Sequence, residues 1–193
     1  AVPSIFPFLT EKLDRDRYFA SIRALVGHES IPVAVTYDDL KTDLAAHLAD
    51  TGITLIDKDA LQPGGDIAAY LRMNPAQPAD TAFLQHSSGS TGLQKGVMLS
   101  HQAVINHIAS YSMAIQLQPD DVIVSWLPLY HDMGLIAGFI MPILQGIPLV
   151  LMSPFEWVRN PKMLLTAIDR HQGTLCWLPN FAYNFLATRV RDK

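Results

Sequence analysis

The stretch that decides the fold is Ser87-Ser88-Gly89-Ser90-Thr91-Gly92-Leu93-Gln94-Lys95-Gly96, which stands between two short apolar segments, 82–85 and 97–99. Its three glycines permit tight turns and let a ligand approach the backbone closely. Four hydroxyl groups, successive backbone N–H groups and the mobile charge of Lys95 can together hold phosphate oxygens. The stretch is not a Walker A loop, because Gln94 stands where that spacing requires glycine. Two readings stay open: a phosphate-binding loop and a polar loop that only joins two strands.

The rest of the chain alternates apolar strands with amphipathic helices. The spacing of apolar residues predicts helices over 14–27, 38–50, 101–115, 132–144, 161–171 and 180–191, and strands over 33–37, 53–56, 122–127, 147–152 and 174–178. Ser100 stands where a helix N-cap is wanted. Residues 61–81 are predicted to be mainly a connector, with one helical turn near 68–71. We therefore expect a single α/β unit over 1–193, with a mainly parallel sheet covered by helices on both faces.

Composition and charge exclude several classes of protein. Of the 193 residues, 49% are hydrophobic and 17% charged, which suits a folded domain with a buried core. The net charge is −4 and no basic run is present, so nucleic acid is not an expected partner. The single cysteine, Cys176, can form neither an internal disulfide nor a cysteine pair for zinc. A reducing, cytoplasmic location is the expectation.

One uncharged stretch, 133–152, is long enough to span a bilayer. Pro142 and Pro148 interrupt it, and Gly146 suits the end of a helix. A helix, a stop at Gly146 and a strand explain the stretch better than a transmembrane segment does. The chain has no initial Met and no signal peptide, and its abrupt apolar start suggests an internal fragment of a longer protein.

Four motifs resemble one known family. The run from Phe83 through the Ser/Thr/Gly-rich loop to His101 resembles the signature loop of the adenylate-forming superfamily. Trp126-Leu127-Pro128-Leu129-Tyr130-His131-Asp132-Met133-Gly134-Leu135 resembles a second motif in the form typical of its fatty acyl branch. Pro179-Asn180-Phe181-Ala182-Tyr183 looks like the acyl-pocket segment of fatty acyl-AMP ligases, and 1–6 like the end of an earlier core motif. The order and spacing of the motifs agree with an acyl-CoA synthetase or fatty acyl-AMP ligase.

The resemblance implies an ATP- and Mg²⁺-dependent ligase that activates a fatty acid as acyl-AMP, with CoA or an acyl carrier protein as the acceptor. It implies that Lys95 and His131 act in catalysis. It implies a nucleotide site made of Ser87, Ser88, Gly89, Ser90, Thr91, Gly92, Lys95 and Gly96. It implies a substrate site made of Tyr130, His131, Asn180 and Phe181, with no metal ligand from the chain. Amino-acid-activating relatives usually place an aspartate where His131 stands, so a fatty acid is the expected substrate.

The chain also departs from the family pattern. Gln94 stands where most members have proline. The later Tyr-Gly-x-Thr-Glu segment, a downstream Gly-Asp that holds the ribose, and the small C-terminal domain with its catalytic lysine are not among these residues, so we expect the 193 residues alone to be inactive. Gly65-Asp66 lies upstream of the loop and is interpreted as a turn. A non-catalytic nucleotide-binding module and a purely structural α/β domain remain the alternatives.

Single residues outside the motifs carry weaker signals. Without its motif, His131 is more simply a histidine at a helix entry that bonds the backbone. Asp120-Asp121 follow a proline and suit a turn better than an acid–base pair. Trp126, Trp157 and Trp177 fit either the core or a pocket wall, and the aromatic residues of 179–186 fit either an alkyl-binding site or the core.

Overall fold

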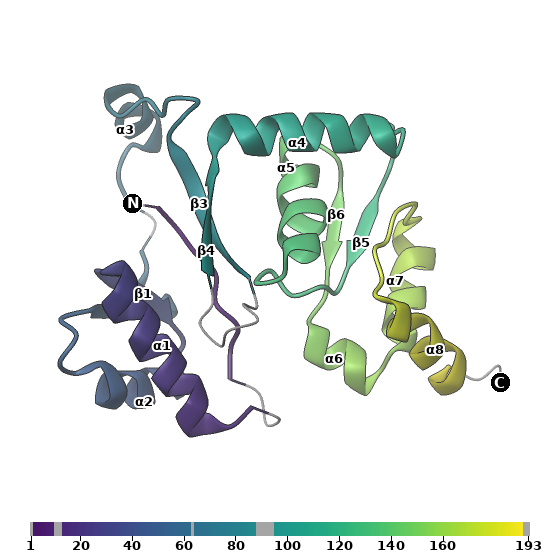
Figure 1. Cartoon of the computed structure of the whole chain (residues 1–193). Coiled ribbons are helices and arrows are strands. Elements are labelled where there is room, and N and C mark those ends of the chain that lie inside the picture. The colour runs from purple at the N-terminus through teal and green to yellow at the C-terminus, as the bar shows by residue number, and fades with distance from the viewer. Residues whose placement is uncertain (1, 10–12, 63, 88–94, 191–193) are drawn as a thin grey trace. The chain divides into compact units, whose positions relative to one another are not determined.

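The computed structural model describes residues 2–9, 13–62, 64–87 and 95–190. The chain divides into two compact units (Figure 1). The first, which we call the motif unit, comprises 1–6, 78–85 and 97–193. The second, the βαβ unit, comprises 7–77 and 86–96. Whether the two behave as one domain stays a prediction.

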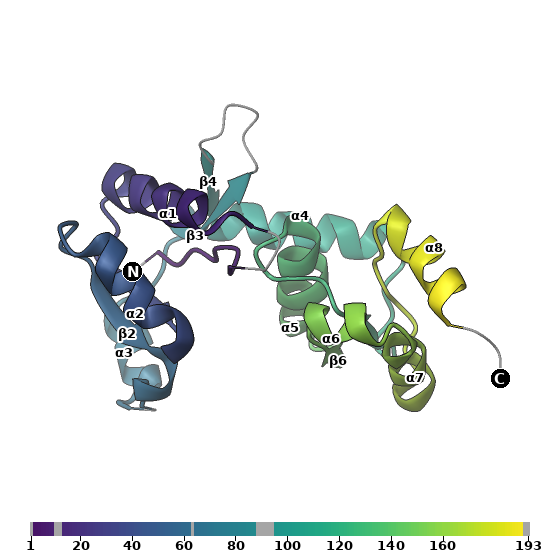
Figure 2. The same ribbon diagram turned by 90° about the horizontal axis from the view of Figure 1, so that it is seen from below.

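The βαβ unit begins with α1 (Arg15–Glu29), β1 (Val33–Thr36), α2 (Asp38–Leu48) and β2 (Thr54–Asp57). β1 and β2 pair in parallel, from Val33 opposite Thr54 to Thr36 opposite Asp57, and α2 forms the crossover between them. α1 and α2 contact one another and lie side by side in both views (Figure 2). Their shared core consists of Phe19, Val26, Leu40, Leu44 and Leu48.

The connector of the βαβ unit holds more helix than expected. After the short helix η1 (Lys58–Ala60), α3 spans Ile67–Met73, where the sequence indicated a single turn. Asp66 is its N-cap and accepts a hydrogen bond from the Ala69 amide at 2.9 Å. Gly65 precedes it with a φ of 79°, so Gly65-Asp66 is the turn interpreted from the sequence, and its role as a helix cap is a further finding of the structure.

The division between the units passes through two paired strands, β3 (Thr81–Ser87) and β4 (Lys95–Ser100). Within the motif unit, Leu84 of β3 also bridges in parallel to Ser4, whose hydroxyl donates to the Leu84 carbonyl at 3.0 Å. Ser100 ends β4 and caps the next helix, since its hydroxyl accepts from the Ala103 amide at 3.1 Å. The predicted N-cap at Ser100 is confirmed.

The motif unit continues with α4 (His101–Ala114), β5 (Ile123–Ser125), η2 (Met133–Ile140), α5 (Met141–Gln145), β6 (Leu149–Leu151), α6 (Pro154–Arg159), α7 (Lys162–His171) and α8 (Asn180–Arg189). β5 is fully buried and pairs in parallel with β6, and Ile123 bridges in parallel to Leu175. One core cluster joins α4 to β5 and α5 through Ile108, Ile123 and Met141, and a second surrounds Trp126 and Trp157.

Two predicted elements differ from the structure. The predicted strand 174–178 is reduced to the bridge at Leu175. The predicted helix 132–144 is a π-helix, η2, followed by the short α5, and its amide at Met141 bonds back to the Ile136 carbonyl. π-helical turns are rare and are enriched at functional sites. Gly146 ends α5 in the left-handed conformation, as expected.

The α/β class and the parallel pairing are confirmed, although the strands of the described residues form three pairs instead of one continuous sheet. In the described part of the chain, no helix combines the length and apolar character needed to cross a membrane.

Candidate functional site

The predicted phosphate loop lies mostly outside the described residues. Ser87 is the last residue of β3 and Lys95 the first of β4. Ser88, Gly89, Ser90, Thr91 and Gly92 fall in the segment between, which the described ranges leave out. The loop therefore joins two paired strands, and its role as a phosphate site stays a prediction.

His86 and Gly96, on either side of the segment that is not described, lie close to Glu29 at the end of α1. The His86 side chain is 2% exposed, and its Nε2 lies 4.0 Å from the Glu29 carboxylate. Burial lowers the pKa of His86, and the charge of Glu29 opposes this shift. A Cβ atom added to Gly96 would lie 2.7 Å from Glu29 Oε1, so glycine is required there as long as Glu29 keeps its place. No sequence pattern marked Glu29, because a single carboxylate at a helix end is common.

The second motif forms a tight turn between β5 and η2. The His131 amide donates to the Pro128 carbonyl at 3.1 Å, and the His131 carbonyl accepts from the Leu135 amide at 2.8 Å. The exposed His131 ring places Nδ1 2.6 Å from the Asp132 carboxylate, which also accepts from the Met133 amide at 2.7 Å. Tyr130 is half-buried, and burial raises its pKa. His131 thus combines the backbone role of a helix-entry histidine with a ring held by a carboxylate.

Two glycines of η2 let this turn fold back tightly. A Cβ atom on Gly134 would lie 2.3 Å from the Pro128 carbonyl oxygen, and one on Gly138 would lie 2.8 Å from Ser125 Oγ. Both distances are too short for any side chain, so η2 rests directly on the end of β5 and the residues after it. Sequence reasoning missed this contact, although glycines four residues apart in an apolar helix were a visible signal.

The third motif packs on the first residue of the second. Phe181 of α8 meets Trp126 and Trp157 edge-on, with ring centroids 6.3 and 6.4 Å apart. Trp126 and Trp157 are buried and stacked at 3.8 Å. Phe185, one turn beyond Phe181, is half-buried and lies 5.3 Å from Trp157. The tertiary structure therefore brings together two motifs that are some 50 residues apart in the chain.

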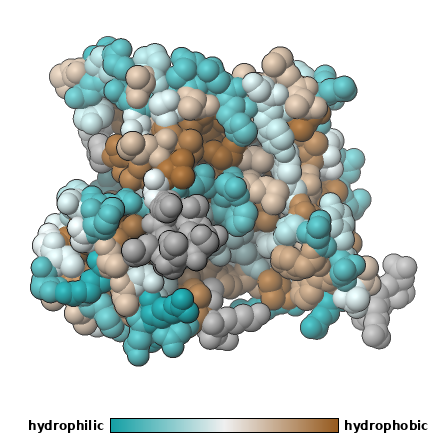
Figure 3. All heavy atoms as spheres, viewed as in Figure 1, coloured by the Kyte–Doolittle hydropathy of each residue, from teal (hydrophilic) through white to brown (hydrophobic). Residues whose placement is uncertain are grey.

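The aromatic residues of 179–186 divide into two kinds. Phe185 packs into the core, whereas Phe181 and Tyr183 remain 60% and 58% exposed. Asn180 is exposed at the start of α8. The core interpretation therefore holds for Phe185, and the alkyl-binding interpretation stays a prediction for the exposed Phe181 and Tyr183. Phe155 and Val158 of α6 are also exposed apolar side chains. Figure 3 shows apolar residues, in brown, at several places on this face of the molecule.

The remaining sequence candidates are structural. Asp121 accepts from the Thr174 hydroxyl and the Gln118 amide, both at 2.7 Å, and these bonds lower its pKa. Asp120-Asp121 therefore belong to a turn, as interpreted. Burial raises the pKa of Cys176 to about 11, which keeps it a thiol. Within the described ranges, no three His, Cys, Asp or Glu side chains converge as a metal site would require.

A family model described as "AMP-binding enzyme" matches residues 8–193. The chain belongs to this family. FadD28 of Mycobacterium tuberculosis, a long-chain-fatty-acid–AMP ligase, is 35% identical to it over 180 residues, which cover 85% of this chain and 30% of that protein. TtuA of Teredinibacter turnerae, a medium-chain-fatty-acid–[acyl-carrier-protein] ligase, is 37% identical over 127 residues, which cover 66% of this chain and 20% of that protein.

Solved structures show the same fold. A fatty acyl-adenylate ligase from L. pneumophila, in complex with acyl adenylate and pyrophosphate, matches with a TM-score of 0.76 at 29% identity, over 97% of this chain and 32% of that chain. The adenylation domain of a keto acid-selecting NRPS module matches with a TM-score of 0.78 at 23% identity, over 92% of this chain and 33% of that chain. The chain thus spans a third or less of these relatives.

Proposed function

We propose that this chain supplies the pyrophosphate-side loop and part of the acyl site of an ATP-dependent ligase that activates a fatty acid. In the proposed reaction, a carboxylate oxygen attacks the α-phosphorus of ATP. The bond between the α-phosphorus and the bridging oxygen breaks, pyrophosphate leaves, and an acyl-AMP anhydride remains. Such a step needs two anions held in line and stabilisation of the departing charge.

The observation that carries the proposal is the contact of Phe181 with Trp126, which joins the second motif to the third. The exposed ring of Phe181, backed by the stacked tryptophans, offers an apolar surface suited to an alkyl chain. The same motif continues into the turn that holds Tyr130 and His131. An apolar surface and a polar turn carried by the same motif suit a substrate that has an alkyl tail and a carboxylate head.

The polar residues divide between the two ends of the reaction. We assign Lys95 and the loop residues from Ser87 to Gly96 to the phosphates, and His131 with Tyr130 to the junction with the acyl site. The Asp132 carboxylate beside Nδ1 favours the tautomer that carries its proton on that nitrogen. The Nε2 atom of His131 is then the one available to a substrate or to a bound water.

The same geometry favours a fatty acid over an amino acid. An ammonium group needs a carboxylate partner, and the Asp132 carboxylate is already engaged by the His131 ring and the Met133 amide. The long- and medium-chain fatty acids in the names of FadD28 and TtuA agree with this substrate class. CoA and an acyl carrier protein are both proposed acceptors.

ATP and Mg²⁺ are the proposed cofactors. Magnesium in nucleotide enzymes is bound by one or two carboxylates together with substrate phosphates and waters. The described residues hold no converging group of three metal-ligating side chains, so we assign no residue of this chain to the ion. It would arrive with the phosphates of ATP.

The first test is pyrophosphate exchange into ATP by the full-length protein. Lys95→Ala should slow fatty-acid-dependent exchange on the order of a hundredfold or more, because one donor to developing charge is lost. Fatty-acid binding should change far less. Lys58→Ala is the matched control, since Lys58 is an exposed lysine that forms an ion pair with the exposed Asp59. An exchange rate that Lys95→Ala leaves unchanged would refute the assignment.

The second test separates the proposal from a non-catalytic nucleotide-binding module. Medium- and long-chain fatty acids should support exchange by the full-length protein, and amino acids should not. The 193 residues alone should show no exchange, because they cover at most a third of the relatives described above. If ATP raises their melting temperature without exchange by either form, the module is the better description.

A further inference from the structure

We propose that Tyr111 of α4 is a positioning residue for the acyl-binding segment, and that it acts through a hydrogen bond from Trp177. The inference rests on the proposed function, in which Phe181 of α8 contacts the fatty acid. It concerns residues outside all four sequence motifs.

The link itself is short and partly buried. Trp177 Nε1 donates to the Tyr111 hydroxyl oxygen at 2.5 Å, across 66 residues of sequence. The two rings also contact one another, with centroids 6.2 Å apart. A partly buried hydrogen bond holds its geometry better than an exposed one, since solvent replaces either partner less easily.

Trp177 stands where the two cores of the motif unit meet. It packs against the cluster around Ile108 and Met141, and also against the cluster around Trp126 and Trp157. Tyr111 belongs to the first of these clusters. The hydrogen bond therefore fixes the indole at the boundary between the α4 side of the unit and the aromatic side.

The position of Trp177 determines where α8 begins. Two residues before it, Leu175 is held by its bridge to Ile123. Two residues after it, Pro179 is the N-cap of α8. Asn180 and Phe181 follow directly, so a shift of Trp177 changes how Phe181 meets the stacked tryptophans. The exposed part of Phe181 is the surface proposed to contact the alkyl chain.

Tyr111 should leave the nucleotide end undisturbed. It lies ten residues after His101, the first residue of α4, which is roughly 15 Å along a helix. The Tyr111→Phe substitution keeps the ring in the core and removes only the oxygen that Trp177 bonds. The substitution should therefore change the KM for the fatty acid and the preferred chain length, but not the KM for ATP.

The experiment uses the full-length protein and a series of saturated fatty acids of six to eighteen carbons, about two carbons apart. With Tyr111→Phe, we expect the KM for the preferred acid to rise about three- to tenfold, which corresponds to one net hydrogen bond. The preferred chain length should also shift, while the KM for ATP stays the same. Tyr70→Phe is the matched control, because Tyr70 is an exposed tyrosine on α3 of the βαβ unit.

Trp177→Phe removes the same hydrogen bond from the donor side. It should reproduce the shift in chain length, and the double variant should be no worse than the more affected single variant, because both remove one interaction. Should Tyr111→Phe fail to fold, the Trp177→Phe result decides alone.

Each remaining outcome has a separate meaning. Unchanged parameters for every acid, with or without a lower melting temperature, would leave Tyr111 a stabilising residue only and refute the inference. Equal changes in the KM values for acid and ATP would refute it too. An inactive wild-type protein would refute the proposed function and the inference with it. An active wild type that Tyr111→Phe does not alter would refute the inference alone.

Discussion

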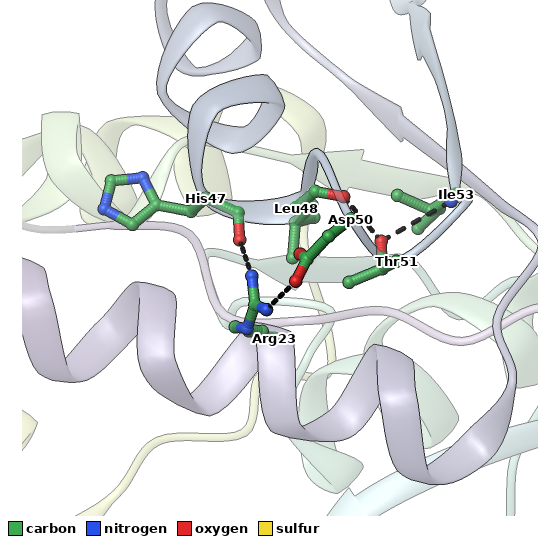
Figure 4. A network of polar contacts seen from close by, with 6 residues as sticks. All are labelled: Arg23, His47, Leu48, Asp50, Thr51 and Ile53. Atoms are coloured by element: carbon green, nitrogen blue, oxygen red, sulfur yellow. Dashed lines mark hydrogen bonds and ion pairs between the residues drawn. The ribbon is translucent and has the colours of Figure 1, made fainter.

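The two units of the chain differ in the contacts that join their own helices and strands. In the βαβ unit, charged residues on α1 bond to α2 and the turn after it, over a small core. Arg23 donates to the His47 carbonyl at 2.8 Å and pairs with Asp50 (Figure 4), and Arg15 pairs with Asp43. In the motif unit, two buried tryptophan rings stack face to face, and two glycines of η2 approach the Pro128 carbonyl and the Ser125 side chain closely.

This difference indicates which unit tolerates change. Exposed ion pairs contribute little to the free energy of unfolding and are screened by salt, so losing one should destabilise the unit only slightly. Stacked rings and close glycine contacts depend on a precise fit. Adding or removing even one methyl-sized group there changes the stability of the fold. The residues proposed to bind the fatty acid lie in the motif unit, as a site that must hold its geometry requires.

The largest expected effect is at Trp157, which is completely buried. Trp157→Ala should lower the free energy of unfolding by about 3–5 kcal/mol, because it removes the stacking partner of Trp126 and opens a cavity. Urea unfolding followed by circular dichroism measures this. Trp157→Phe should cost much less, since its indole N–H has no hydrogen-bond partner among the described residues. Equal losses for both variants would contradict the aromatic packing described here.

Next is the glycine contact of η2. Gly134→Ala should destabilise the protein by about 1–3 kcal/mol, because its methyl group would overlap the Pro128 carbonyl. The same turn carries His131, so exchange activity of the full-length protein should also fall. Gly27→Ala in α1 is the matched control, because nothing lies near a Cβ atom there, and it should be neutral or stabilising. A neutral Gly134→Ala would refute the close approach.

A smaller effect is expected from pH in the βαβ unit. Burial lowers the pKa of His86, so the unfolded chain takes up a proton at a higher pH than the folded one. Stability should therefore fall as pH drops below about 6.5. His86→Asn should reduce this dependence, measured as melting temperature between pH 7.5 and 5. The control His28→Asn alters an exposed histidine and should leave the slope unchanged. A slope that His86→Asn leaves as steep as in the wild type would contradict the buried neutral imidazole.

The smallest expected effect is at the Arg23–Asp50 pair, which is exposed on both sides. The hydrogen bond from Arg23 lowers the pKa of Asp50, so the pair stabilises the protein above the ordinary aspartate pKa and loses this effect as pH falls through the lowered value. Asp50→Asn should reduce the melting temperature slightly at pH 7, less so in high salt, and not at all near pH 2. A loss as large as that of Trp157→Ala would overturn the contrast between the units.

The sequence was informative where a local pattern suffices. Periodicity predicted the α/β class, the helices α1, α2, α4 and α7 to within a few residues, and the stop at Gly146. Capping chemistry identified Ser100 because an N-cap depends only on the residues that follow it. The motifs indicated the family, which the match over residues 8–193 confirms. Their assignment as site residues stays a prediction.

Only the tertiary structure decided how the motifs meet. Whether Phe181 or Phe185 faces the core depends on the position of the Trp126–Trp157 stack, and no local pattern specifies a contact between residues so far apart. The same holds for Glu29 beside Gly96, for the π-helix over Gly134, and for Tyr111 beside Trp177. Local backbone preferences act over a few residues and can be read in order along the chain. Packing acts between residues that only the folded chain brings together, so it determines which face of a helix becomes a site.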